Sequence, residues 1–158
     1  LFPERNFIGV DVKGNRLHAG AKDALTEGLH NVAFVRTRIE IIGQFFAENE
    51  VDEIWITFCD PFPRPSKANR RLTSAYFNEK YRHVLRPGGL VHLKHDDDPL
   101  VKYALGILAE DPQCKLLLQN MDIYAGELPM QELSIKTLYE GKHLAAGKTI
   151  KYLRYTIH

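Results

Sequence analysis

Short apolar runs alternate with segments of helical spacing along this chain, and the alternation restricts the fold more than any other feature. Strand patterns are expected over residues 7–12, 32–35, 54–58 and 90–94, and helical patterns over residues 14–27, 39–47, 73–85 and 99–109. Strands that alternate with helices form βαβ units, whose strands run parallel. The sequence therefore predicts an α/β, Rossmann-like, doubly wound fold with a mostly parallel sheet.

The last part of the chain departs from this alternation. Residues 115–119 and 149–157 have strand patterns, and no clear helical pattern separates them. Parallel neighbours need a crossover connection, whereas antiparallel neighbours do not. We therefore expect an antiparallel edge at the C-terminal side of the sheet.

Size and composition are those of an ordinary globular domain. The 158 residues are enough for one domain with a hydrophobic core, and a formal net charge of +1 means that any binding of nucleic acid must rest on a local patch. Cys59 and Cys114 are too few for a disulfide framework, which favours the reducing cytoplasm. No apolar run approaches the length of a membrane span, and the histidines show no metal-ligand spacing.

A carboxylate follows the third strand pattern at a point where a ligand site is expected. In open parallel sheets, ligands bind beyond the carboxyl ends of the strands. Asp60 lies at such an end, and Pro61 and Pro63 stiffen the turn because neither can donate a backbone hydrogen bond. A basic cluster follows, consisting of Arg64, Lys67, Arg70 and Arg71. This combination indicates a site for a polar, anionic substrate, with the basic residues on phosphates.

The start of the chain contains half of a nucleotide-binding pattern. Asp11 comes late in the first strand pattern, where Rossmann-like folds place the acid that binds ribose hydroxyls. The glycine-rich turn that should precede this strand is not in the sequence. We therefore expect residues 1–158 to form a single domain that is truncated at its N-terminus and lacks its first strand.

Four motifs resemble those of the bacterial-type tRNA (guanine-N7)-methyltransferases, which depend on S-adenosylmethionine. They occur in the family's order and cover nearly the whole chain. The motifs are Phe7-Ile8-Gly9-Val10-Asp11, Asp60-Pro61-Phe62-Pro63-Arg64 with Arg70-Arg71-Leu72, Leu93-Lys94-His95-Asp96, and Thr137-Leu138-Tyr139-Glu140. The chain departs from the family at Phe62, where a Trp is usual, at His95, where a Thr is usual, and at Arg38, near a position that usually contacts adenine.

The resemblance implies methyl transfer from S-adenosylmethionine to N7 of a guanine in the tRNA variable loop. It assigns Asp60 as the catalytic residue, and the cofactor ligands as Asp11, Arg38, Ile39 and Asp60. It assigns substrate binding to Arg64, Asp96, Thr137, Leu138, Tyr139 and Glu140, and the RNA backbone to Lys67, Arg70 and Arg71. It also implies a cytoplasmic monomer or homodimer.

The chemistry of guanine N7 fits carboxylates at such a site. N7 is an unprotonated acceptor on the base edge, so its methylation needs no general base. The enzyme must hold N7 in line with the sulfonium methyl, at roughly 3 Å. Asp60 and Asp96 can accept hydrogen bonds from N1–H and the 2-amino group, which become stronger donors as the ring gains positive charge.

Two alternatives stay open at the level of the sequence. An S-adenosylmethionine methyltransferase with a small-molecule substrate would keep Asp11 and Asp60 but would not need the basic cluster. A non-catalytic tRNA-binding fragment would need the basic cluster but no methyl donor. Steep salt dependence of tRNA binding separates the first alternative from an RNA enzyme, because phosphate contacts release counterions.

Overall fold

The computed structural model describes residues 2–158, which divide into two compact units, the first ending at Phe45 and the second covering Phe46–His158. The first unit contains β1 (Phe7–Asp11), α1 (Gly14–Thr26), β2 (Val32–Arg36) and the 3-10 helix η1 (Ile39–Gln44). Strands β1 and β2 pair in parallel, with Phe7 opposite Val32 and Asp11 opposite Arg36. This unit is a single βαβ motif, as the first strand and helix patterns predict.

Phe34 explains how α1 packs on its two strands. A Cβ added at Gly9 of β1 would lie 2.8 Å from the Phe34 ring, and one added at Gly20 of α1 would lie 3.0 Å from it. Both glycines therefore make room for an aromatic side chain between helix and strands. Gly28, at φ +66°, follows the end of α1 in the left-handed conformation that commonly terminates helices.

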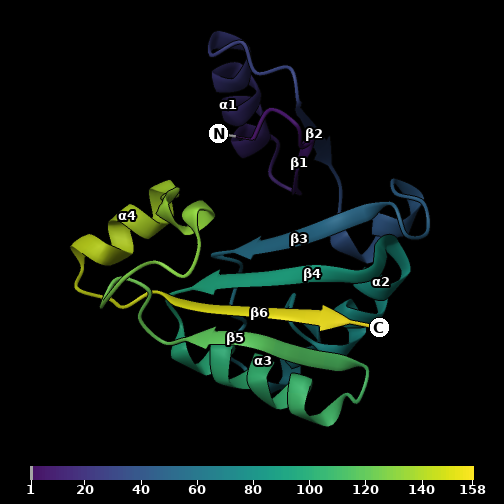
Figure 1. Ribbon diagram of the computed structural model, residues 1–158, viewed down its shortest axis with the longest axis vertical. Coiled ribbons are helices and arrows are strands. Elements are labelled where there is room, and N and C mark those ends of the chain that lie inside the picture. Colours follow the sequence, from purple (N-terminus) through teal and green to yellow (C-terminus); the bar gives the residue numbers. More distant parts are fainter. Residues whose placement is uncertain (1) are drawn as a thin grey trace. The chain divides into compact units, whose positions relative to one another are not determined.

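The second unit is a four-stranded sheet with helices on both faces (Figure 1). Its elements are β3 (Val51–Thr57), η2 (Pro65–Arg70), α2 (Ala75–Val84), β4 (Leu85–His95), α3 (Asp98–Glu110), β5 (Cys114–Asn120), η3 (Gln131–Ser134), α4 (Leu138–Ala145) and β6 (Lys151–Ile157). The strand order is β3-β4-β6-β5. Strand β3 pairs in parallel with β4, whereas β6 is antiparallel to both of its neighbours.

This architecture confirms the predicted α/β class and its mostly parallel strands. Strands β3, β4 and β5 run in one direction, and β6 alone opposes them. The antiparallel pairing lies at the predicted side of the sheet, but β6 is an interior strand and β5 forms the edge. Strand β6 lies between β4 and β5, which both come earlier in the chain. The long connection after β5 lets the chain return over the sheet to this position.

Two expectations about helices need correction. The segment between the last two strands holds η3 and α4, where the sequence showed no clear helical pattern. The pattern over residues 39–47 forms only the 3-10 helix η1, which is interrupted at Ile41 (φ −114°, ψ 23°). Three β-branched residues, Ile39, Ile41 and Ile42, disfavour a regular α-helix there.

Strands β4 and β6 form the centre of the core because both of their faces are covered. Val91, Leu93, Leu153 and Tyr155 lie on one face, against buried residues of α2 and α3. On the other face, Tyr152 packs with residues of the segment between β5 and β6, namely Ile123, Leu133 and Ile150. A side chain of this size stabilises the fold by about 1.5–3 kcal/mol when fully buried. Among the described residues, no helix is long and apolar enough to cross a bilayer.

Candidate active site

The Asp60 loop follows β3 at the carboxyl end of the β3–β4 pair. The carboxylate Oδ1 of Asp60 accepts a hydrogen bond from the Phe62 backbone N–H at 3.0 Å, while the side chain remains exposed. Phe58 and Phe62 flank the aspartate with φ of 48° and 41°, in the left-handed region that bulky side chains rarely adopt. Such strain persists only where surrounding structure enforces it, and it is concentrated at functional sites.

Arg71 helps to hold the Asp60 loop in this strained conformation. Its Nε donates to the carbonyl oxygens of Pro61 (3.0 Å) and Phe62 (3.2 Å), and its Nη2 donates to Phe62 O (3.0 Å). The guanidinium also lies over the Tyr103 ring, 4.3 Å from its centroid. Only 9% of Arg71 is exposed. The donors of Arg71 thus hold the loop that carries Asp60, and its contact with the RNA backbone stays a prediction.

The other three basic residues remain available at the surface. Arg64 is the residue before η2, and Lys67 and Arg70 belong to its last turn. All three side chains are exposed. Their exposure leaves Arg64, Lys67 and Arg70 accessible to a ligand, and their roles toward RNA stay predictions.

His95 ties the Asp60 loop to the end of β4. Its Nε2 lies 2.8 Å from the carbonyl oxygen of Cys59, and its Nδ1 lies 2.9 Å from the backbone N–H of Asp97. A carbonyl can only accept and a backbone N–H can only donate, so these partners require the neutral tautomer with hydrogen on Nε2. The imidazole thus links the loop after β3 to the end of β4.

Cys59 is next to Asp60 but is not a nucleophile. Burial raises the pKa of its thiol to about 12, and the charges of Asp60 and Asp97 act in the same direction. The thiol therefore stays protonated at neutral pH, and a protonated thiol is a poor nucleophile.

Asp96 lies directly after β4 and is held by three cationic or titratable groups. Its Oδ2 accepts from Lys148 Nζ at 2.6 Å and lies 3.2 Å from His143 Nδ1, while its Oδ1 lies 3.5 Å from His95 Nδ1. Burial alone raises the pKa of Asp96, but the Lys148 hydrogen bond and the charges of His143 and Lys148 lower it below its usual value. The carboxylate is ionised at neutral pH. The Lys148 side chain is half exposed, whereas that of Asp96 is 7% exposed.

Glu140 is fully buried, in contrast to its predicted role as a base ligand. Its Oε1 lies 2.8 Å from Lys94 Nζ and accepts from the Tyr124 hydroxyl at 2.6 Å, and its Oε2 accepts from the Thr137 backbone N–H at 3.3 Å. Thr137 Oγ1 accepts from the Glu140 N–H at 3.1 Å, which completes a capping box. Both oxygens thus have partners inside the protein, and the binding of guanine by Glu140 stays a prediction.

The two middle residues of the motif at positions 137–140, Leu138 and Tyr139, face solvent. Leu138 is 73% exposed and Tyr139 is 43% exposed, at the beginning of α4. Figure 1 places α4 beyond the ends of β3 and β4, on the side toward which both arrows point. Leu138 and Tyr139 are therefore the most accessible residues of this motif.

The predicted cofactor residues of the first unit are held locally. Asp11 accepts hydrogen bonds from the Lys13 backbone N–H (2.9 Å) and from Arg16 Nη1 (3.4 Å) at the end of β1. Arg38 forms an exposed ion pair with Glu40 at 2.9 Å. Ile39 begins η1 directly afterwards. An acid at the end of a strand, followed by a helix, has the local geometry of a ribose site.

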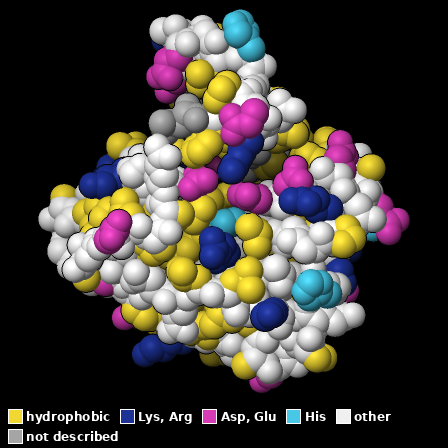
Figure 2. Space-filling model, viewed as in Figure 1, with side chains coloured by type: hydrophobic (Ala, Val, Ile, Leu, Met, Phe, Trp, Pro, Cys, Tyr) yellow, Lys and Arg dark blue, Asp and Glu magenta, His cyan; other side chains and the backbone are white. Residues whose placement is uncertain are grey.

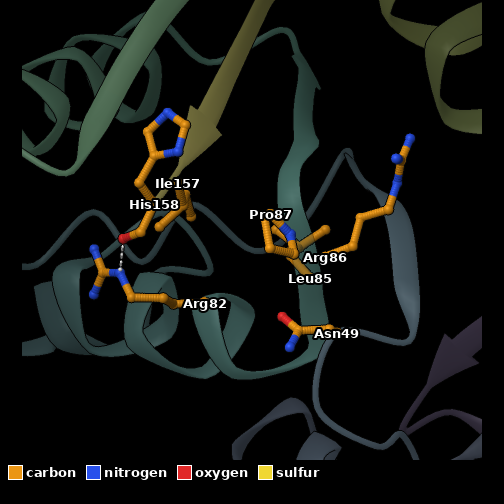
Figure 3. Close-up of a pocket in the computed structure, with 7 residues that line it drawn as sticks. All are labelled: Asn49, Arg82, Leu85, Arg86, Pro87, Ile157 and His158. Carbon is orange, nitrogen blue, oxygen red and sulfur yellow. Dashed lines mark hydrogen bonds between the residues drawn. The ribbon is translucent and has the colours of Figure 1, made fainter.

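A pocket of about 200 Å³ lies at the opposite end of the sheet from Asp60 (Figure 3). Its lining comes from Asn49, Arg82, Leu85, Arg86, Pro87, Ile157 and His158. Arg82 Nε donates to the backbone oxygen of His158 at 2.7 Å, and its Nη atoms pair with Glu79 and Asp111. Arg86 pairs with Asp52. Both arginines that line the pocket, Arg82 and Arg86, therefore have acidic partners.

The surface shows no broad field of one charge sign on the face drawn in Figure 2, where basic, acidic and apolar side chains are interspersed. This matches the net charge of +1.

Sequence reasoning assigned no role to three residues that organise the site, Lys94, His95 and Tyr124. The sequence does contain a signal for Lys94. A lysine that continues the mostly apolar strand pattern from Leu90 to Leu93 is expected to be buried, and a buried lysine needs a partner. His95 was noted only as a departure from the family. Tyr124 carried no local signal, since its partner Glu140 is 16 residues away.

Solved structures with the same architecture define the class of the fold. A SAM dependent methyltransferase from Aquifex aeolicus superposes with a TM-score of 0.60 at 14% identity, over 97% of this chain and 69% of that chain. TrmN from Thermus thermophilus superposes with a TM-score of 0.61 at 20% identity, over 97% of this chain and 36% of that chain. The chain has a Rossmann-like methyltransferase fold.

Sequence comparison narrows the class to one family. A family model described as "Putative methyltransferase" matches residues 1–153. The tRNA (guanine-N(7)-)-methyltransferase of Christiangramia forsetii is 46% identical over 98% of this chain and 69% of its own length. That of Bacteroides thetaiotaomicron is also 46% identical, over 99% of this chain and 61% of its own length. The chain belongs to the tRNA (guanine-N7)-methyltransferase family, and it spans about three fifths to two thirds of these relatives' lengths.

Proposed function

We propose that the protein containing this chain transfers the methyl group of S-adenosylmethionine to N7 of a guanine in tRNA, in the variable loop. The observation that carries the proposal is the Asp60 loop. It presents an exposed carboxylate at the carboxyl end of β3, in a strained conformation that Arg71 and His95 hold. The identity to curated tRNA (guanine-N(7)-)-methyltransferases supports the choice of substrate.

In this proposal the methyl donor contacts residues that follow strand ends. Asp11 accepts hydrogen bonds from the ribose hydroxyls, and the backbone at Arg38 and Ile39 contacts the adenine. Asp60 contributes to the methyl-donor site and lies nearest to the reacting atoms. S-adenosylmethionine supplies an electrophilic methyl group, and the chain's residues orient the base toward it.

The guanine would be held from the side of β4 and α4. Asp60 and Asp96 accept hydrogen bonds from N1–H and the 2-amino group, so their stabilising effect grows as the ring becomes cationic. For Asp96 this requires that the base displaces Lys148, whose side chain is half exposed. Thr137, Leu138 and Tyr139 border the base, and Arg64 approaches the target nucleotide. Lys67 and Arg70 bind RNA phosphates.

The two units would belong to a single methyltransferase domain. One family model matches continuously across both of them, and the relatives are longer than this chain. We propose that a glycine-rich strand–turn–helix segment outside these residues completes the domain. The reaction would take place in the cytoplasm, on a monomer or homodimer.

A radiolabel transfer assay on the full-length natural protein tests this function. Tritiated S-adenosylmethionine and transcribed tRNA should give label that is released by cleavage chemistry specific for 7-methylguanine. A transcript in which the variable-loop guanine is replaced by adenine should remain unlabelled. Label in small molecules but not in RNA would favour the small-molecule alternative. Salt-dependent tRNA binding without any transfer would favour the non-catalytic binding module.

A further inference from the structure

A buried lysine at the end of β4 connects the sheet to the segment that borders the substrate. We propose that Lys94 is a positioning residue for the methyl transfer: through Glu140, it fixes the start of α4 relative to the end of β4. The inference rests on the proposed function, because the segment concerned is the one assigned to the base.

The ammonium group of Lys94 has a complete set of partners. It donates to the carbonyl oxygens of Leu133 at 2.9 Å and Ile135 at 3.1 Å, and it lies 2.8 Å from Glu140 Oε1. Lysine has three N–H donors, so none is left over. The residue is only 2% exposed. One side chain of the sheet therefore holds the end of η3, the loop after it and the first turn of α4.

Glu140 closes the network from the side of α4. Besides Lys94, its carboxylate accepts from the Tyr124 hydroxyl and from the Thr137 backbone N–H. Burial, together with the hydrogen bond and the charge of Glu140, raises the pKa of Tyr124 well above its ordinary value. The phenol therefore remains a donor across the neutral range. Every oxygen of this buried carboxylate has a partner.

The location of the network gives it a functional consequence. Lys94 directly precedes His95, which ends β4 beside the Asp60 loop, and Asp96 follows it. Glu140 directly follows Thr137, Leu138 and Tyr139, the proposed border of the base. The Lys94–Glu140 pair therefore sets the distance between the two sides of the proposed guanine site. Neither residue needs to touch the base.

Stability alone is a poor explanation of such a pair. Desolvation of two charges offsets much of their attraction, and apolar replacements of buried ion pairs are often neutral or stabilising. Directional hydrogen bonds to two carbonyl groups and a carboxylate, however, specify one geometry. We therefore expect geometry at the site to depend on Lys94 more than the free energy of unfolding does.

Three variants of the full-length protein separate these two contributions. Lys94→Met leaves Glu140 buried and unpaired, so it should lower both the melting temperature and activity. Lys94→Met with Glu140→Gln removes the unpaired charge and retains an acceptor for the capping box. Lys102→Met, an exposed lysine of α3, is the matched control and should resemble the natural protein.

The double variant gives the decisive result. We expect it to recover most of the melting temperature while kcat for tRNA methylation stays at least tenfold below that of the natural protein. S-adenosylmethionine affinity should change less than twofold. Hydrogen exchange should accelerate in residues 133–145 and remain slow in β4 and β6.

Other outcomes would overturn the inference. Recovery of kcat together with the melting temperature in the double variant would reduce Lys94 to a charge-neutralising residue. Unchanged exchange in residues 133–145 would show that Lys94 does not hold that segment. An inactive natural protein would instead overturn the proposed function. Assays of the natural protein and of the Lys102→Met control show this before any Lys94 variant is assayed.

Discussion

Asp60 combines exposure with a rigid backbone. Its carboxylate is open to solvent, while Arg71 and His95 hold the carbonyl groups of the residues on either side of it. A preorganised group of this kind stabilises developing charge without reorganising during the reaction. This property is the one that the proposed role of Asp60 in methyl transfer uses.

Replacement of Asp60 by Asn should therefore affect catalysis more than binding. Asn keeps the size of the side chain but loses the negative charge that stabilises the cationic ring. We expect kcat to fall about 100-fold or more, as for other preorganised electrostatic groups. Single-turnover methylation of tRNA measures this, with tRNA affinity determined in parallel. A loss confined to tRNA affinity would contradict the proposed role.

Arg70 and Arg71 are neighbours in sequence with different expected roles. Arg70→Ala should weaken tRNA binding, and the slope of log affinity against log salt should become shallower by about 1. Arg71→Met should leave that slope unchanged and lower kcat, because the buried guanidinium holds the Asp60 loop. Filter binding at several salt concentrations compares the pair. Equal slope changes for both variants would mean that Arg71 also contacts phosphate.

Strand β4 illustrates how one element serves two purposes. Val91 and Leu93 point to one face of the sheet, where α2 and α3 cover them, while His92 and Lys94 point to the other. The second face is covered by the segment between β5 and β6. Buried polar groups on this face need partners from that segment, which is why Lys94 finds Glu140 there.

His92 should make stability depend on pH. It is fully buried, stacked on Trp55 at 4.0 Å and 2.7 Å from the Tyr152 hydroxyl, and burial lowers its pKa from 6.5 to about 4, assisted by the charge of Arg154. The unfolded chain binds a proton below pH 6.5 that the folded chain does not bind until about pH 4. The free energy of unfolding should therefore fall by up to about 3 kcal/mol as pH drops through this window.

Urea denaturation at pH 7 and at pH 4.5 measures this effect. Glu53, whose Oε2 lies 3.5 Å from His92 Nε2, would reduce it by pairing with a protonated ring. His92→Gln should be less stable at pH 7 but should lose most of the pH dependence between pH 6.5 and 4.5. A slope that survives in this variant would have to come from other groups.

The capping box at the start of α4 offers a test at the scale of one helix. Thr137→Ala removes the hydroxyl that accepts from the Glu140 N–H. Loss of an N-cap side chain costs about 1 kcal/mol. Thermal unfolding should show a decrease of this size, and hydrogen exchange should quicken in the first turn of α4. An unchanged melting temperature would show that the Lys94–Glu140 pair alone holds the helix start.

At the scale of the whole molecule, the two units differ in how much core they contain. Among the described residues of the first unit, Ala24 and Ile42 are the buried hydrophobic side chains, whereas the second unit holds the rest of the core. Regions with few buried apolar groups open at lower free energy. The first unit should therefore be the less stable of the two in this chain.

Native-state hydrogen exchange of residues 1–158 provides the measurement. Amides in β1 and β2 should exchange at least tenfold faster than those in β4 and β6. Equal protection of both sheets would show that the units unfold as one cooperative body. The slowly exchanging amides of the second unit should remain slow under conditions in which the amides of β1 exchange fast.

Much of the fold could be predicted because it is recorded in local patterns. Apolar runs and helical spacing determine β1, α1, β2, β3, α2, β4 and α3, and the carboxylates at strand ends mark where a site can form. The sequence also identified Asp60, which the structure leaves exposed at a strand end. These features depend on neighbours within a few residues, so a linear pattern contains them.

The tertiary structure alone decided which charged residues are available to a substrate. Arg71 and Glu140 look equivalent to Arg70 and Asp60 in sequence, yet both are buried and engaged with groups brought close by folding. The position of β6 between β4 and β5 has the same origin, and so does the pairing of Lys94 with Glu140, which are 46 positions apart in sequence. A buried charge is stable only beside partners, and contacts between distant segments determine where those partners lie.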